Sequence, residues 1–325
     1  LSGTPTWGMD ATATFDSAVV INNTGATSFT AGSAIRCTAF TLTAGVYADG
    51  GFLHTVSGDL LLTAGALTTT GNWTVTGTAN LSIVIGCRPA TLTVNGTYTA
   101  TANSYAKSLA GSGSLQLVNT TFQVVPTANS FCTFSGVTAS GTGKLLIGDI
   151  ANGRTNAGFT VECPLDLRIS PSGTATFSGM ITAAGKQVAV YTGTSGVNPG
   201  TASLAGGIRC GNLKLGVAAS TLPGKVIFGG NCYVATIARS NAAETTNVVD
   251  FASGTVYMTG TSDLTGITAL NTAGQLVSGT LNNCDLTGQG ALQHFWPAAA
   301  GTGNTNVTEL PLPRPLLGLG LSLGV

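Results

Sequence analysis

Residues 206–239 read GGIRCGNLKLGVAASTLPGKVIFGGNCYVATIAR. Three short apolar runs, NLKLG, KVIFGG and CYVATIA, are separated here by segments rich in Gly, Ala, Ser or Asn. Leu213 and Leu215 are two residues apart, as are Val226 and Phe228, which is the period of a pleated, half-buried strand. No 3.6-residue helical period competes with this pattern. The stretch therefore predicts short strands joined by tight turns.

The same pattern recurs elsewhere in the chain. Ile208-Arg209-Cys210 followed by NLKLG resembles Ile35-Arg36-Cys37 followed by AFTLTAG. Residues 144–148, KLLIG, followed by GFTVECPLDLRIS, match KLG followed by KVIFGGNCYVATIA with a different turn length. Imperfect repeats of this kind are typical of a chain built from stacked coils.

Strand-length runs continue with little interruption from about residue 31 to residue 297. Examples are FTLTAG (40–45), GDLLLTAG (58–65), LSIVIG (81–86), ATLTVNG (90–96), GKLLIGD (143–149) and QVAVYTG (187–193). Turn residues at such short intervals fit either a series of β-sandwiches or a β-solenoid. The internal repeats favour the solenoid. The expected fold is therefore all-β, a parallel β-helix or β-solenoid over residues 31–297, with flexible terminal arms.

Composition supports this expectation and limits the partners. Charged residues are 7% of the 325, hydrophobic residues are 43%, Gly occurs 46 times, and the formal net charge is zero. Scarce helix formers and abundant Thr and Val favour β structure, and the apolar content is not that of a disordered chain. Lys and Arg are spread singly, so we expect no nucleic-acid binding. No segment suits a membrane-spanning helix, so we expect no membrane insertion.

The seven cysteines are widely spaced and include no CxxC pair, which argues against a disulfide framework and against a zinc site. Their spacing is close to one or two coils of about 22 to 26 residues. We expect them to be buried thiols in the core.

The sequence offers little for catalysis or for a cofactor. His54 and His294, its two histidines, lie outside any nucleophile motif, and no metal-ligand cluster or phosphate-binding glycine loop occurs. Glu162 and Asp166 would share a face if they lay in one strand, but Cys163-Pro164-Leu165 between them makes a turn equally plausible. We expect no enzyme activity, no catalytic residue, no metal and no cofactor.

The two ends differ from the middle. Residues 1–30 are expected to form an N-terminal arm or a capping coil. Residues 298–325 begin with a linker-like AAAGTGNTN and end in TELPLPRPLLGLGLSLGV, with three prolines and alternating leucines. This end either packs on its own solenoid or docks on the sheet edge of a partner. The docking residues would be Leu310, Leu312, Leu316, Leu317, Leu319, Leu321 and Leu323.

The strand style of GGIRCGNLKLG…GKVIFGGNCYVATIAR and GDLLLTAGALTTTGNWTVTG resembles two groups of β-solenoid proteins. One group is the decoration, fibre and spike proteins of tailed bacteriophages, and the other is the passenger domains of bacterial adhesins. The first resemblance implies a homotrimeric, non-enzymatic virion protein that contacts the capsid shell and can also contact a host-surface glycan. The second implies a bacterial cell-surface or extracellular location.

Two further functions are weaker expectations. Thr-x-Thr occurs at 41–43, 68–70, 74–76, 91–93, 97–99 and 174–176. An ice-binding solenoid would need one such motif in each coil, in register on a flat face. A glycan-cleaving tailspike would need an acidic groove.

Overall fold

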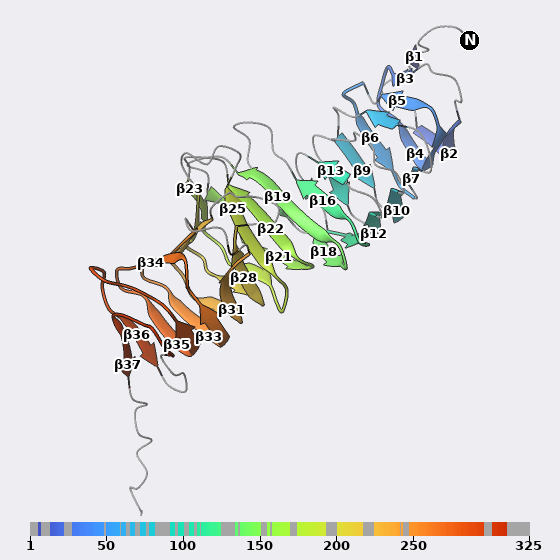
Figure 1. The fold of residues 1–325 in the computed structure, drawn as a ribbon. Coiled ribbons are helices and arrows are strands. Elements are labelled where there is room, and N and C mark those ends of the chain that lie inside the picture. The colour runs from blue at the N-terminus through green and yellow to red at the C-terminus, as the bar shows by residue number, and fades with distance from the viewer. Residues whose placement is uncertain are drawn as a thin grey trace, which may run out of the picture.

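The computed structural model is an elongated rod with β1 (Thr6–Trp7) and β37 (Val307–Leu310) at its opposite ends (Figure 1). It describes residues 6–7, 14–22, 28–48, 50–58, 60–62, 66–68, 72–75, 78–81, 92–94, 97–100, 104–106, 109–110, 112–124, 134–135, 137–150, 155–156, 158–169, 174–192, 200–216, 224–240, 242, 247–295 and 301–310. No helix occurs within these ranges, and hence none that could cross a membrane.

The strands form four sheets, and the strand pairings within the described ranges are parallel. The longest sheet has 20 strands: β2 (Thr14–Asn22), β4 (Arg36–Ala44), β6 (Leu53–Val56), β7 (Leu60–Leu62), β9 (Asn72–Val75), β10 (Thr78–Leu81), β11 (Leu92–Val94), β12 (Thr97–Ala100), β14 (Leu109–Ala110), β15 (Ser114–Leu117), β17 (Phe134–Ser135), β18 (Thr138–Gly141), β21 (Phe159–Glu162), β24 (Ile181–Ala183), β27 (Ile208–Cys210), β30 (Cys232–Val234), β33 (Thr255–Asp263), β35 (Gln275–Asn282), β36 (Leu292–Phe295) and β37 (Val307–Leu310).

Three smaller sheets complete the other sides of the rod. The seven-stranded sheet contains β13 (Ser104–Ala106), β16 (Thr121–Val124), β19 (Lys144–Ile150), β22 (Leu165–Ile169), β25 (Val188–Thr192), β28 (Asn212–Leu215) and β31 (Thr236–Arg239). The six-stranded sheet contains β20 (Thr155–Asn156), β23 (Thr174–Phe177), β26 (Thr201–Leu204), β29 (Lys225–Phe228), β32 (Asn247–Phe251) and β34 (Ile267–Asn271). The four-stranded sheet contains β1 (Thr6–Trp7), β3 (Ser28–Ala31), β5 (Val46–Ala48) and β8 (Ala66–Thr68).

This arrangement is a parallel β-solenoid, so the predicted fold is confirmed. In the middle of the rod, each coil contributes one strand to the six-stranded sheet, one to the longest sheet and one to the seven-stranded sheet. The strands β29, β30 and β31 form one such coil. Ile208 pairs with Cys232, and Cys232 pairs with Val256, 24 residues further on each time. The coil length expected from the cysteine spacing therefore matches this part of the rod.

The repeats seen in the sequence occupy equivalent places. Ile208-Arg209-Cys210 is β27 of the longest sheet, and Ile35-Arg36-Cys37 spans the start of β4 in the same sheet, with Ile and Cys buried and Arg exposed in both. The patterns differ afterwards, because Arg36–Ala44 continues as one long strand, whereas the chain turns at Gly211 into β28. The first motif and the residues after it therefore lie in one sheet, whereas the second motif and the residues after it lie in two.

Stacked inward side chains fill the core. Along β29 the burial alternates, so that Val226 and Phe228 are fully buried while Lys225 and Ile227 are partly exposed. The Phe228 ring packs on the Phe251 ring of the next coil, with 5.7 Å between ring centroids. Because adjacent coils bury the same positions, the core is continuous along the rod.

One turn requires glycine. Gly207 has φ +87°, and a β-carbon there would lie 2.0 Å from the Asn231 carbonyl oxygen of the next coil. The coils approach so closely at this corner that a side chain would collide with backbone.

The coils become shorter towards the C-terminus. Leu276 pairs with His294 across 18 residues, and Leu292 pairs with Val307 across 15. Asn304 closes the last coil: its Nδ2 donates to the Leu281 carbonyl oxygen at 2.7 Å, and its Oδ1 accepts from the Cys284 backbone N–H at 2.9 Å.

The ends of the described chain enter the solenoid. The strand β2 pairs with β4, within the segment 1–30 that we expected to be an arm or a capping coil. Residues 301–310 begin inside the expected linker, yet they run beside β35 and β36 and include β37. Their asparagines and glycines form turns held by hydrogen bonds, which composition alone does not distinguish from a flexible linker.

Candidate binding face on the longest sheet

The paired carboxylates considered in the sequence are not a pair in space. Glu162 ends β21 in the longest sheet and is exposed, whereas Asp166 lies in β22 of the seven-stranded sheet. The corner at Cys163-Pro164 separates them. Asp166 is 3% exposed and forms an ion pair with Lys144, Nζ to Oδ2 2.6 Å. The turn interpretation is therefore the correct one.

Both histidines are buried in structural positions. His54 accepts a hydrogen bond from the Ile35 backbone N–H at Nδ1, 3.0 Å away. His294 donates from Nε2 to the Gly279 carbonyl oxygen at 3.1 Å, and burial lowers its pKa. Within the described ranges, no group of three or more His, Cys, Asp or Glu could hold a metal ion.

Five of the seven cysteines can be located, and all five are buried and free: Cys37, Cys163, Cys210, Cys232 and Cys284. Cys87 and Cys132 lie outside the described residues. Burial raises the pKa of Cys37 and Cys163 to about 11, and that of Cys210, Cys232 and Cys284 to about 12. Cys210 and Cys232 lie in neighbouring strands but are not opposite each other, because the strand register places Cys232 beside Ile208. Both thiols are free.

These thiols should be nearly inert in the folded protein, because the thiolate is the reactive form and burial disfavours it. With Ellman's reagent at about pH 8, we expect no more than two of the seven cysteines to react before unfolding, and all seven to react in denaturant. Rapid reaction of most of the seven in the native protein would contradict the buried positions.

The Thr-x-Thr motifs do not share one face. Thr68 lies in the four-stranded sheet and Thr174 in the six-stranded sheet, whereas Thr41 and Thr97 lie in the longest sheet. An array for ice would need them in one register, so their placement does not favour that function.

The leucines proposed for docking are almost all beyond the described chain. Leu310 ends β37, where it pairs with Phe295. Leu312, Leu316, Leu317, Leu319, Leu321 and Leu323 lie outside the described residues. Their docking role stays a prediction.

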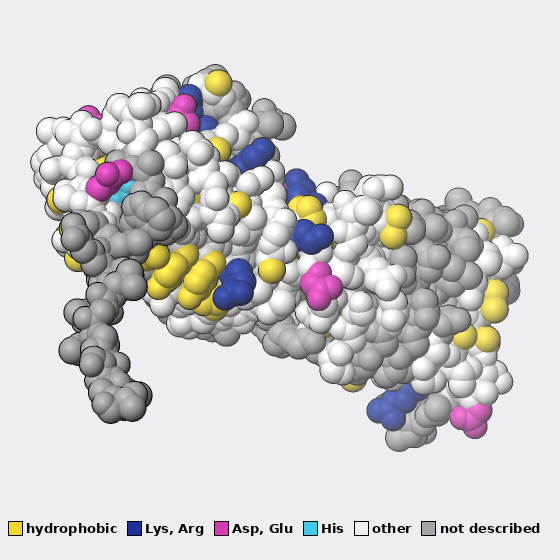
Figure 2. All heavy atoms as spheres, turned by 90° about the horizontal axis from the view of Figure 1, so that it is seen from below, with side chains coloured by type: hydrophobic (Ala, Val, Ile, Leu, Met, Phe, Trp, Pro, Cys, Tyr) yellow, Lys and Arg dark blue, Asp and Glu magenta, His cyan; other side chains and the backbone are white. Residues whose placement is uncertain are grey.

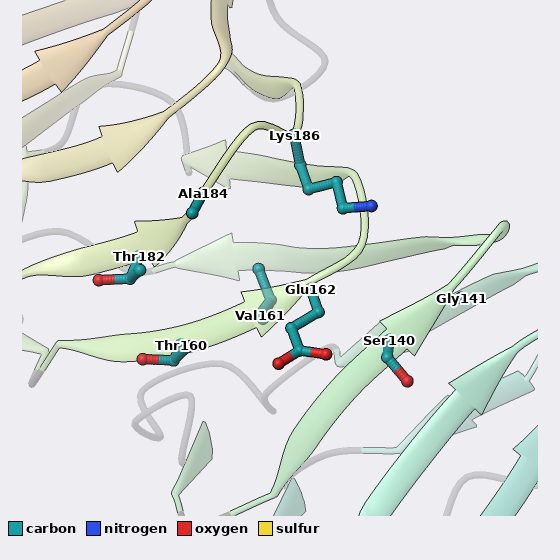
Figure 3. Close-up of a pocket in the computed structure, with 8 residues that line it drawn as sticks. All are labelled: Ser140, Gly141, Thr160, Val161, Glu162, Thr182, Ala184 and Lys186. Atoms are coloured by element: carbon teal, nitrogen blue, oxygen red, sulfur yellow. The ribbon is translucent and has the colours of Figure 1, made fainter.

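A shallow groove of about 590 Å³ lies on the outer side of the longest sheet. It is lined by Ser140, Gly141, Thr160, Val161, Glu162, Thr182, Ala184 and Lys186. Figure 3 shows the Glu162 carboxylate between Thr160 and Ser140, with Lys186 extending from the turn that precedes β25. Glu162 is the one carboxylate among these lining residues, so the groove itself does not offer the two carboxylates that glycoside hydrolysis uses.

A ladder of stacked side chains continues from this groove along the same sheet. The register runs from Thr160 to Thr182, then to Arg209, Tyr233 and Tyr257, one residue in each coil. The Arg209 guanidinium carbon lies 4.7 Å from the centroid of the Tyr233 ring. The Tyr233 and Tyr257 rings stack at 4.7 Å and 10°. We call Arg209, Tyr233 and Tyr257 the Arg–Tyr–Tyr ladder.

The ladder lies on the solvent side of the sheet. Arg209 is exposed, and both tyrosines are partly exposed, whereas their strand neighbours Ile208, Cys232 and Val256 are buried. The face seen in Figure 2 has hydrophobic side chains in a row near the C-terminal end, followed by Lys or Arg side chains towards the middle.

Sequence reasoning missed this ladder, although a signal was present. Arg209, Tyr233 and Tyr257 are spaced by 24 residues, the coil length of this region. A search for the 24-residue period among polar and aromatic residues, as well as among core residues, would have placed Arg209, Tyr233 and Tyr257 at equivalent positions of successive coils.

Comparison of the chain with models of known protein families finds no match, and comparisons with curated proteins and with solved structures find none either. The function must therefore be inferred from the fold and from the geometry of this face.

Proposed function

We propose that the protein is a non-enzymatic structural component of a virion, of the type that decorates or stabilises a bacteriophage capsid or forms part of a fibre or spike. The supporting observation is the longest sheet, whose parallel pairing runs without a break from β2 to β37. The strands between these two are paired on both edges, except β17, for which β14 is the one strand partner within the described residues. Few sheet edges are therefore open along the rod. A rod of this construction supports itself and resists unfolding from its sides.

The proposed partners are two further copies of the same chain, in a homotrimer, and the capsid shell. Zero net charge gives a lone monomer little protection from association. The mass of the purified protein, measured by light scattering, should be that of three chains. A monomer at all accessible concentrations would contradict the trimer.

The location can be tested on particles from the native source. An antibody against the rod should label virions in electron micrographs, and the protein should sediment with purified phage heads. Labelling of cell envelopes without labelling of virions would contradict the virion proposal.

The second candidate is a bacterial surface adhesin. The observation that favours it is the outer face of the longest sheet, where the groove and the Arg–Tyr–Tyr ladder form a continuous polar and aromatic surface on the side of the rod. An adhesin binds through its side, whereas a capsid decoration does not need such a surface. Labelling of envelopes by the same antibody would support this candidate.

Removal of the C-terminal segment tests its proposed docking role. Deletion of residues 311–325 leaves β37 and the closed coils intact, so we expect an unchanged circular dichroism spectrum and an unchanged midpoint of thermal unfolding. Assembly should be lost, because burial of each leucine side chain contributes about 1.5 to 3 kcal/mol. A full-length control with Leu316, Leu319 and Leu321 replaced by serine should also fail to assemble. If the truncated chain assembles with unchanged affinity, the docking role is wrong.

A further inference from the structure

The Arg–Tyr–Tyr ladder has one open aromatic face. Arg209 covers one face of Tyr233, and Tyr257 covers the other. In the following coil Tyr257 pairs with Ser278, whose hydroxyl donates to the Met258 carbonyl oxygen at 2.5 Å. Val277, the extra residue of the β-bulge beside Ser278, is also partly exposed. Neither side chain carries a ring, and among the described residues Tyr233 is the one ring that stacks on Tyr257. Another flat, partly apolar group can therefore pack on the outer part of the Tyr257 ring.

The charged groups on this face are not neutralised by neighbours. Among the described residues, Arg209, Lys186 and Glu162 form no ion pair, whereas the buried Asp166 is paired with Lys144. The two cations and one carboxylate give this face a small positive excess. A guanidinium stacked on an aromatic ring keeps its planar donors directed outward, and such a fork matches a carboxylate.

The spacing indicates a ligand that lies along the rod. Neighbouring strands are about 4.8 Å apart, so Arg209 and Tyr257, two coils apart, are separated by about 10 Å. Beyond Arg209 the same row continues with the hydroxyls of Thr182 and Thr160, in register through β24 and β21. In β18, Thr138 directly precedes Ala139, which pairs with Val161. An elongated molecule with hydroxyl groups can therefore meet an aromatic face, a cation and a row of hydrogen-bonding side chains in succession.

We propose that the Arg–Tyr–Tyr ladder and the adjoining groove bind an oligosaccharide that carries carboxylate groups. One sugar ring packs on the open face of Tyr257, a sugar carboxylate binds Arg209, and hydroxyls of the following units bond Thr182 and Thr160. This inference goes beyond the proposed structural function and holds equally for a virion and for a cell surface.

Other polymers suit this face less well. A nucleic acid needs several cations to neutralise its phosphates, and this chain has zero net charge. A peptide that adds a strand needs an open sheet edge, and the strands that carry the ladder, β27, β30 and β33, are paired on both sides.

The test is binding of the full chain to immobilised polygalacturonate, alginate and polysialic acid, with dextran as the neutral polysaccharide and dextran sulfate as a non-carboxylate polyanion. We expect at least one of the three carboxylated polymers to bind more tightly than both dextrans. Arg209→Gln and Tyr257→Ala should each weaken that binding by about tenfold or more, since each removes one contact that binds the sugar.

Two matched controls separate binding from folding. Arg36→Gln removes the equivalent exposed arginine of the earlier Ile-Arg-Cys motif, which pairs with Thr14 and Thr55 in place of tyrosines. Tyr257→Phe keeps the aromatic face. Both should bind as the parent protein does, and all four variants should retain its circular dichroism spectrum.

Three results would overturn the proposal. They are no binding to any carboxylated polymer, equal or tighter binding to either dextran, and binding that Arg209→Gln and Tyr257→Ala leave unchanged. None of these results bears on whether the protein is found in virions, so failure of this inference is distinguishable from failure of the proposed function.

Discussion

Replacing Phe228 with alanine should lower the free energy of unfolding by about 3 to 5 kcal/mol, the usual cost of deleting a buried phenylalanine ring. Phe228 is fully buried, and its ring packs on Phe251 of the next coil. Its strand partner in the preceding coil is Leu204, which is also fully buried. The cavity would thus be lined by rigid neighbours on both sides along the rod. Urea unfolding followed by circular dichroism measures the change.

Ile227→Ala is the control for this substitution. Ile227 precedes Phe228 in β29 but points to the outer side of the sheet and is partly exposed. We expect less than half of the Phe228→Ala effect, because part of this side chain is already in water. Equal effects of the two substitutions would show that the assignment of inner and outer positions in β29 is wrong.

Lys144→Met should produce the second large loss of stability, about 2 kcal/mol near pH 7. The substitution leaves the Asp166 carboxylate buried without its cation. Breaking a fully buried pair costs about 3 to 5 kcal/mol, and we expect less because the Lys144 side chain is 38% exposed.

The loss should depend on pH in a defined direction. Burial raises the pKa of Asp166 above its usual value, and the hydrogen bond and charge of Lys144 lower it. Without Lys144 the folded-state pKa rises further, so the folded variant holds its proton more tightly than the unfolded chain does. The destabilisation is then full above the folded-state pKa and fades as the pH falls towards the unfolded value of about 3.9. Unfolding curves at about pH 7 and about pH 4 measure the difference.

The double variant with Lys144→Met and Asp166→Leu is the control. It removes both charges, so it should recover most of the stability lost at neutral pH and should lose the pH dependence. A single variant whose destabilisation is the same at both pH values would contradict the role assigned to Asp166.

Much of the fold could be predicted from the sequence, because the core repeats. The spacing of Leu213, Leu215, Val226 and Phe228 indicated inward positions, and all four are buried. The strands could be predicted from the local alternation of apolar residues, and the coil length from the repeats. A single sequence shows both patterns.

The features that were missed depend on three-dimensional neighbours. Asp166 is in a strand whose outward positions are covered, and no local pattern indicates that a carboxylate there is buried beside Lys144. The short coils of residues 275–310 are closed by asparagine hydrogen bonds such as those of Asn304, and the same composition also occurs in linkers. The candidate face combines residues from separate coils, so it becomes visible only when the register is known.

The parallel pairing of the longest sheet has a mechanical consequence. Its hydrogen bonds run between coils, along the length of the rod, so a pull on the two ends loads the coils in series. A coil can then peel from the end of the stack while those behind it stay folded. Each coil of 24 residues would release about 80 Å of extended chain in place of the roughly 5 Å it occupied in the stack. When a single molecule is stretched, it should lengthen in steps of that size. Compression along the rod would instead press the coils together against the packed core.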